Sequence, residues 1–86
     1  MPASLFQIRQ GYRASWRDLS LSVESGSQQW TVRVHDARTD LYTAHRSSAR
    51  AAQAAGMEYA IFRVLGPAAG ESPERLAQQV NWNQYW

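Results

Sequence analysis

Two histidines are the first side chains of this sequence to consider for chemistry, because imidazole is the commonest transition-metal ligand and titrates near neutral pH. His35 and His45 fall in predicted strands that pair so that both project from one face of a sheet. In that register His45 stands opposite Thr31, which is roughly 13 Å from His35 along a strand that rises ~3.3 Å per residue. One ion cannot bridge that distance, and Asp18 faces His35 alone. We therefore expect surface histidines, with no metal site and no cofactor.

A nucleophile, a base and an acid also share the predicted face, in Ser20 or Ser22, His35 and Asp18. A flat, open sheet face excludes no water and offers no oxyanion donors, so proximity on it does not make an active site. The absence of cysteine excludes thiol catalysis and disulfides. The glycines of segment 66–70 lack the lysine of a phosphate-binding loop. We expect no catalytic residue and no enzymatic activity.

Arginines provide the candidate contacts for an anion. Arg46 and Arg50, with His45, lie at the start of a predicted helix, where the free amides and the helix dipole already favour negative charge. Cations there are either solvated or joined by an anion. On the predicted sheet, Arg33 and His35 project from the polar face. The candidate contacts for an anion or a nucleic acid are therefore Arg33, His35, Arg46 and Arg50.

Three stretches alternate apolar and polar side chains with the two-residue period of half-buried strands. They predict a three-stranded antiparallel meander over residues 15–46, followed by a main helix over 47–65. Residues 1–14 are expected to be a flexible lead-in or an edge strand. After Gly66 and Pro67 stop the main helix, a short helix is expected over 72–80. The fold class is α+β in a single domain of 86 residues.

The register of the meander follows from its apolar face. A first turn at Gly26 sets Val23 opposite Trp30, and a second turn sets Val34 opposite Tyr42. The opposite face is then polar except for Leu41, which argues against this register. A polar face is solvated or contacted by a ligand. Its expected members are Asp18, Ser20, Ser22, Thr31, Arg33, His35, Leu41, Thr43 and His45.

The main helix is predicted to carry two apolar stripes, with Ser47 or Ser48 as its N-cap. The first stripe is suited to lie on the sheet. The second is limited to the C-terminal half and needs another cover, for which we expect the short helix, with Ser72 as its N-cap. The first stripe is Ala51, Ala52, Ala55, Tyr59 and Phe62, and the second is Met57, Ile61, Val64 and Leu65.

The aromatic tail over 81–86 allows two interpretations. Trp82, Tyr85 and Trp86 either close the core over the second stripe or form an interface with a protein partner or a second copy, since aromatic side chains concentrate binding energy. Deleting the tail would separate them, because loss of folding indicates a core and loss of association alone indicates an interface.

Composition narrows the setting in which the protein acts. Nine basic residues, all arginine, against seven acids leave a formal charge of +2, which permits a polyanionic partner without indicating one. The N-terminus lacks the pattern of a signal peptide, and the longest uninterrupted apolar run, 59–62, is far too short to span a bilayer. We expect a cytoplasmic protein with no membrane association.

Residues 30–66 resemble two families of DNA-binding domains, those of ethylene-response factors and the integrase arm-binding domains. The resemblance rests on a tryptophan that opens the middle strand, Asp36 before the turn, the alanine-rich helix and the ending at Leu65 and Gly66. It implies that the sheet face reads the major groove. The chain departs from these families at 24–29, where they carry arginines. The helix is also similar to the second helix of double-stranded-RNA-binding domains, without their basic cluster.

In size, arginine-only basicity and expected architecture the chain resembles small uncharacterised proteins encoded in GC-rich proteobacterial genomes. That resemblance implies a family of unknown function. Taken together, these features favour a small non-catalytic protein-binding module. The alternative is a nucleic-acid-binding domain that uses the face of its sheet.

Overall fold

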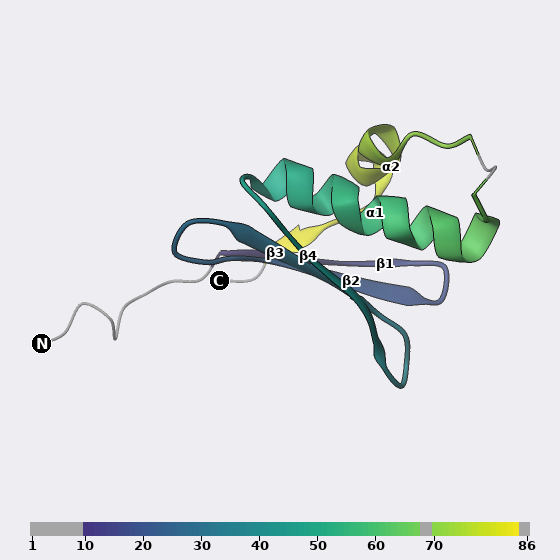
Figure 1. Cartoon of the computed structure of the whole chain (residues 1–86), viewed down its shortest axis with the longest axis horizontal. Helices are drawn as coiled ribbons and strands as arrows, with labels where there is room; N and C mark the ends of the chain where they lie inside the picture. Colours follow the sequence, from purple (N-terminus) through teal and green to yellow (C-terminus); the bar gives the residue numbers. More distant parts are fainter. Residues whose placement is uncertain (1–9, 68–69, 85–86) are drawn as a thin grey trace, which may run out of the picture.

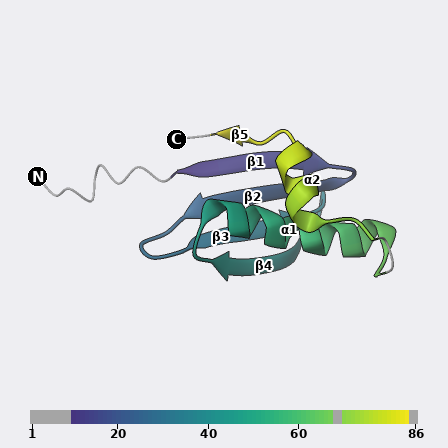
Figure 2. The same cartoon turned by 90° about the horizontal axis from the view of Figure 1, so that it is seen from above.

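A five-stranded antiparallel sheet carries both helices on one of its faces (Figure 1). The computed structural model describes residues 10–67 and 70–84. The strand order is β4-β3-β2-β1-β5, and seen from above α1 runs along β3 while α2 lies on the β1 side (Figure 2). The elements are β1 (Gly11–Trp16), β2 (Leu19–Ser25), β3 (Trp30–His35), β4 (Asp40–Arg46), α1 (Ala49–Leu65), α2 (Pro73–Gln79) and β5 (Asn83–Gln84).

The α+β class is confirmed, but the prediction of three strands is wrong by two. β1 lies partly within 1–14, for which an edge strand was one of the two expectations, and its alternating Tyr12, Ala14 and Trp16 lie opposite the apolar side chains of β2. β5 lies within the expected aromatic tail and pairs with β1 over two residues only. A strand this short has no periodicity to detect. Residues 1–9 of the expected lead-in lie outside the described residues.

The turn between β1 and β2 consists of Arg17 and Asp18. Arg17 has a φ of 58°, which is uncommon for a residue with a side chain. Its guanidinium lies over the Trp16 ring, 5.1 Å from the centroid. Asp18 was expected opposite His35. Asp18 belongs to the turn, and the observed register of β2 against β3, which differs by two residues, puts Ser20 opposite His35.

The predicted register of β2 against β3 is shifted by two residues. Val23 pairs with Val32, not with Trp30. The turn is centred one residue later than expected, between Ser27 and Gln28, and is closed by the Gly26 N–H, which donates to the Gln29 carbonyl at 2.6 Å. Because side chains alternate with a period of two, a shift of two leaves every side chain on its expected face.

The predicted register of β3 against β4 is confirmed, since Val34 pairs with Tyr42 and Val32 with Ala44. A bulge then shifts the pairing, so that His35 stands opposite Asp40 and Leu41 has no partner of its own. Leu41 packs against the core instead of lying on the polar face. An apolar Leu41 on the polar face argued against the predicted register. The bulge resolves this, because one extra residue turns the Leu41 side chain to the core and leaves the rest of the ladder unchanged.

Capping residues set the ends of both helices. The Ser48 side chain accepts from the Ala51 N–H, so α1 starts two residues later than the predicted 47. It ends at Gly66, whose φ of 90° few other residues adopt. The Ser72 side chain accepts from the Arg75 N–H, and α2 covers 73–79 of the predicted 72–80.

The sheet-facing side of α1 differs from the predicted stripe. Ala52 and Ala55 are buried as expected, but Phe62 is 56% exposed. The helix is rotated so that Gly56 meets the sheet, because a Cβ there would lie 2.7 Å from Val32 Cγ2. The predicted second stripe is buried only at Met57 and Ile61.

The core lies between the sheet and the helices in two clusters. One joins Leu21 and Val34 to Met57 of α1 and Ala77 of α2, so the short helix covers the second stripe at Met57, while Val64 and Leu65 stay exposed. The other joins Val23 and Val32 with alanines of α1. Among the described residues, no helix has the length and apolarity needed to cross a membrane.

Candidate functional site

The sheet face away from the helices, here called the open face, is entirely polar apart from Gly11. Both helices cover the opposite face of the sheet, and no described element packs on the open face (Figure 1). The register places Arg33 and His35 on this face, as predicted, together with Arg13 of β1. The side chains of the open face are Arg13, Ser15, Ser20, Ser22, Glu24, Thr31, Arg33, His35, Asp40, Thr43, His45 and Asn83.

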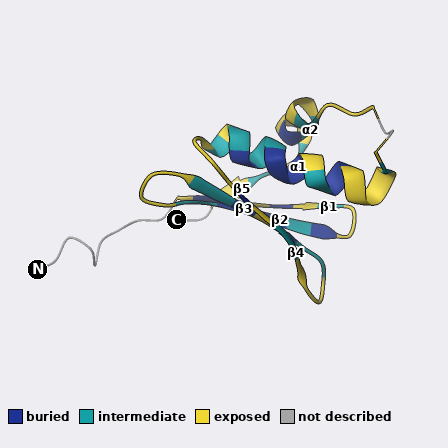
Figure 3. Ribbon diagram, viewed as in Figure 1, coloured by how far each residue is buried: buried dark blue, intermediate teal, exposed yellow. Residues whose placement is uncertain are grey.

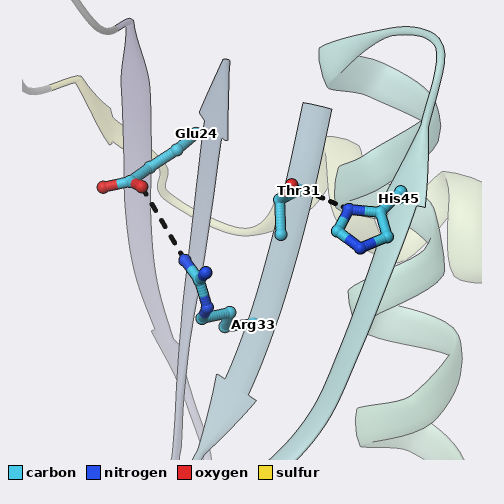
Figure 4. Close-up of polar contacts among 4 residues, drawn as sticks. All are labelled: Glu24, Thr31, Arg33 and His45. Atoms are coloured by element: carbon cyan, nitrogen blue, oxygen red, sulfur yellow. Dashed lines mark hydrogen bonds and ion pairs between the residues drawn. The ribbon is translucent and has the colours of Figure 1, made fainter. Parts of the chain in front are cut away.

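Cross-strand contacts engage Glu24, Arg33, Thr31 and His45 on the open face (Figure 4). The Arg33 guanidinium lies 3.8 Å from the Glu24 carboxylate, and both side chains are partly exposed. The Thr31 hydroxyl and His45 Nδ1 lie 2.9 Å apart. Exposed ion pairs of this kind contribute little stability. The Glu24 carboxylate offsets part of the positive charge that Arg33 offers to an anion.

The two histidines stand apart, as the strand spacing predicts. His35 Nδ1 donates to the Asp36 carbonyl at 3.3 Å, whereas His45 contacts Thr31 across a different part of the sheet. Within residues 10–67 and 70–84, no three histidine or carboxylate side chains lie close enough to hold a metal ion.

A shallow hollow of about 430 Å³ lies on the open face across β1, β2 and β3. Polar and charged side chains line it, with charges of both signs, and they include Arg13, Ser20, Glu24 and His35. Such a hollow can hydrogen-bond a polar ligand, but it lacks the apolar walls that enclose a small-molecule site.

The two arginines at the start of α1 lie on the other side of the sheet from Arg33. Arg46 and Arg50 line one hollow of about 430 Å³ between the helices, and Glu58 and Glu74 line it too. Arg46 Nη1 donates to the carbonyl of its neighbour His45 at 2.7 Å. The four candidate contacts therefore divide into two separate pairs, and His45 does not join Arg46 and Arg50.

Of the three candidate partner contacts in the tail, the structure describes Trp82 alone. Trp82 packs against both core clusters, and its Nε1–H donates to the Ala77 carbonyl at 2.8 Å. Trp82 thus takes the position that the core interpretation expects. Tyr85 and Trp86 lie outside the described residues.

Exposed apolar side chains gather at the C-terminal end of α1 (Figure 3). Phe62, Val64 and Leu65 are 56%, 39% and 41% exposed. The helical pattern assigned all three to buried stripes. They remain exposed because Gly56 faces the sheet and thereby sets the rotation of the helix. In the sequence, the only sign of this rotation is the glycine that interrupts the alanine-rich stripe.

The Asp36 carboxylate holds the turn before β4. Its Oδ1 accepts from the backbone N–H groups of Arg38 at 2.8 Å and Thr39 at 2.9 Å. These bonds, that of Arg38 first, lower the pKa of Asp36 below its ordinary value of 3.8. The carboxylate therefore has a structural role at the end of the open face.

Lowering the pH through the folded-state pKa of Asp36 is expected to lower the free energy of unfolding. Because this pKa is lower in the folded chain, the unfolded chain binds more protons in acid. The stability that the Asp36 carboxylate contributes is therefore complete above pH 3.8 and is lost as the pH falls through the folded-state pKa. Asp36→Asn, which cannot titrate, should be less stable than the parent at neutral pH and converge with it in acid. Urea unfolding over a pH series measures this, and a difference independent of pH contradicts it.

Comparisons of the chain with protein-family models, with curated proteins and with solved structures found no match.

Proposed function

We propose that the chain is a non-catalytic module that binds another protein chain. The observation that carries this proposal is the exposure of Phe62 and Leu65, here called the apolar patch, at 56% and 41%. The two residues are three apart on a helix and lie on neighbouring parts of its surface. Large apolar side chains exposed together mark protein interaction sites in small domains.

The surroundings of the patch support a protein partner over a small ligand. A hollow of about 240 Å³ adjoins it, lined by Phe62, Ile61 and Pro67 with Glu58 and Glu71. An apolar centre with a charged rim is the usual composition of a protein interface. Phenylalanine buried at such a centre contributes a large share of the binding energy.

Replacing both patch residues is expected to abolish partner binding without unfolding the domain. Phe62→Ser with Leu65→Ser should weaken association more than about 10-fold, because the apolar area removed from water is lost. Gln78→Ser, at an exposed position of α2, is the matched control. Crosslinking in an extract of the source cells identifies a partner, whose purified form is then titrated against the parent and both variants.

Sedimentation of the parent over a range of concentrations tests self-association in the same way. Retained folding must be checked by amide spectra of each variant. If no association depends on the patch, with the same chain or with another protein, the proposed function is wrong.

A second candidate function is nucleic-acid binding by the open face. It is favoured by one observation, that both helices cover the other face and leave Arg13, Arg33 and the two histidines uncovered together. Salt-dependent binding of a duplex oligonucleotide, with amide shifts at Arg33, His35 and Thr43, would support it. No shift at these residues on adding the oligonucleotide would leave the protein partner as the favoured function.

A further inference from the structure

β4 is the outer strand at one side of the sheet, and no described element pairs with its far edge. It is seven residues long, whereas the strand at the other side, β5, has two. Proteins usually block such an edge with proline, lysine or bulges. β4 contains neither residue, and its bulge at Leu41 lies near one end.

The peptide groups that point away from the sheet can be identified from the ladder. The bond from the Gly26 N–H to the Gln29 carbonyl sets the alternation along β2 and β3, so Thr31 and Arg33 direct their peptide groups toward β2. Their partners in β4, His45 and Thr43, therefore direct theirs outward. The Arg46 guanidinium bonds to the His45 carbonyl, which agrees with a carbonyl that lacks a strand beside it.

We infer that β4 pairs with β4 of a second copy of this chain, antiparallel and centred on Ala44. This inference rests on the proposed function, since it names the partner. Thr43 and His45 are the two outward residues, and pairing centred on Ala44 sets Thr43 against His45 of the partner subunit and the reverse. Both narrow pairs of the new ladder are then complete.

The charges of β4 complement a second β4. The strand begins at Asp40 and ends at Arg46. Antiparallel pairing places the acidic start of each strand near the basic end of the other. Asp40 lies on the open face and Arg46 on the helix side, so the two charges attract each other at long range and do not form a direct ion pair. Parallel pairing would set like charges together.

The helix side of the same edge supports the same partner. Tyr59 of α1 stacks on Tyr42 of β4, with ring centroids 4.7 Å apart. Phe62 follows three residues later, so it lies on the flank of α1 above the β4 edge. A twofold axis through Ala44 brings this flank beside the N-terminal half of the partner's helix. Such pairing uses the same edge on both copies and closes at two.

Thr43→Pro tests the edge directly. Because the Thr43 N–H points outward, proline removes a donor that only the partner uses, and a proline is tolerated at such a position of an edge strand. Sedimentation equilibrium of the full chain is expected to show a dimer for the parent and a dissociation constant raised more than about 100-fold in the variant. Thr43→Val keeps the N–H and should leave the constant within about threefold.

A charge exchange tests the antiparallel direction and does not depend on proline. Arg46→Glu places two acids at each end of the interface and is expected to weaken the dimer about threefold at low salt, because charges on the two faces of the sheet interact only at long range. Adding Asp40→Arg to that variant should restore the parent constant. Amide spectra of each variant confirm the fold.

Three results overturn the inference: a parent that stays monomeric at all concentrations, a dimer that Thr43→Pro leaves unchanged, or a charge exchange that fails to restore it. None of these overturns the proposed function, which fails only if no protein association depends on Phe62 and Leu65. If the serine variants disrupt the dimer and Thr43→Pro does not, the inference of pairing through β4 is refuted and the proposed function stands.

Discussion

Trp82→Ala is expected to lower the free energy of unfolding by about 3 kcal/mol. The indole packs against both core clusters and donates to the Ala77 carbonyl at 2.8 Å, so its removal leaves a cavity beneath α2 and an unpaired carbonyl. A chain of 86 residues has a total stability of roughly 4–13 kcal/mol at 0.05–0.15 kcal/mol per residue. The loss should lower Tm by roughly 12–24 °C.

Trp82→Phe separates the two contributions. It keeps most of the apolar volume and removes the donor, so about 1 kcal/mol of the loss should remain. Calorimetry or urea titration measures both variants. If Trp82→Ala costs no more than an exposed substitution such as Gln78→Ala, Trp82 does not close the core, and the interface interpretation of the tail would take its place.

Gly56→Ala is expected to destabilise the protein by up to about 2 kcal/mol, although alanine is the better helix former. A Cβ at position 56 would lie 2.7 Å from Val32 Cγ2 and 3.1 Å from Leu21 Cδ2. Overpacking of this kind costs about 1–3 kcal/mol, against about 1 kcal/mol gained from helix propensity. Val32 is branched at Cβ and cannot easily turn its methyl groups away.

A double-mutant cycle tests the cause. In the background of Val32→Ala, which removes the crowded methyl groups, Gly56→Ala should cost less than in the parent and can become stabilising. Ala54→Gly, on a less crowded side of α1, measures propensity by itself and should cost about 1 kcal/mol. If Gly56→Ala raises the free energy of unfolding in the parent, α1 does not approach the sheet as closely as the contact at Val32 requires.

Residues that form the candidate surfaces were only partly predictable. Arg33 and His35 could be placed on the open face because alternation in β3 depends on local sequence. The exposure of Phe62 could not, because it depends on how α1 is rotated, and that rotation depends on a contact between Gly56 and strands far away in the sequence. The outward peptide groups of β4 depend likewise on which strands pair.

The sequence by itself determined the α+β class, β2 to β4, both helices with their serine caps, and the face on which most of their side chains lie. These features depend on periodicity and capping, which act within a few residues. Only the tertiary structure decided between a lead-in and a strand at β1, added β5 to the sheet, turned Leu41 to the core through a bulge, and placed Arg46 and Arg50 away from Arg33. The physical reason is that strand pairing and helix rotation minimise exposed apolar surface and unpaired peptide groups over the whole chain.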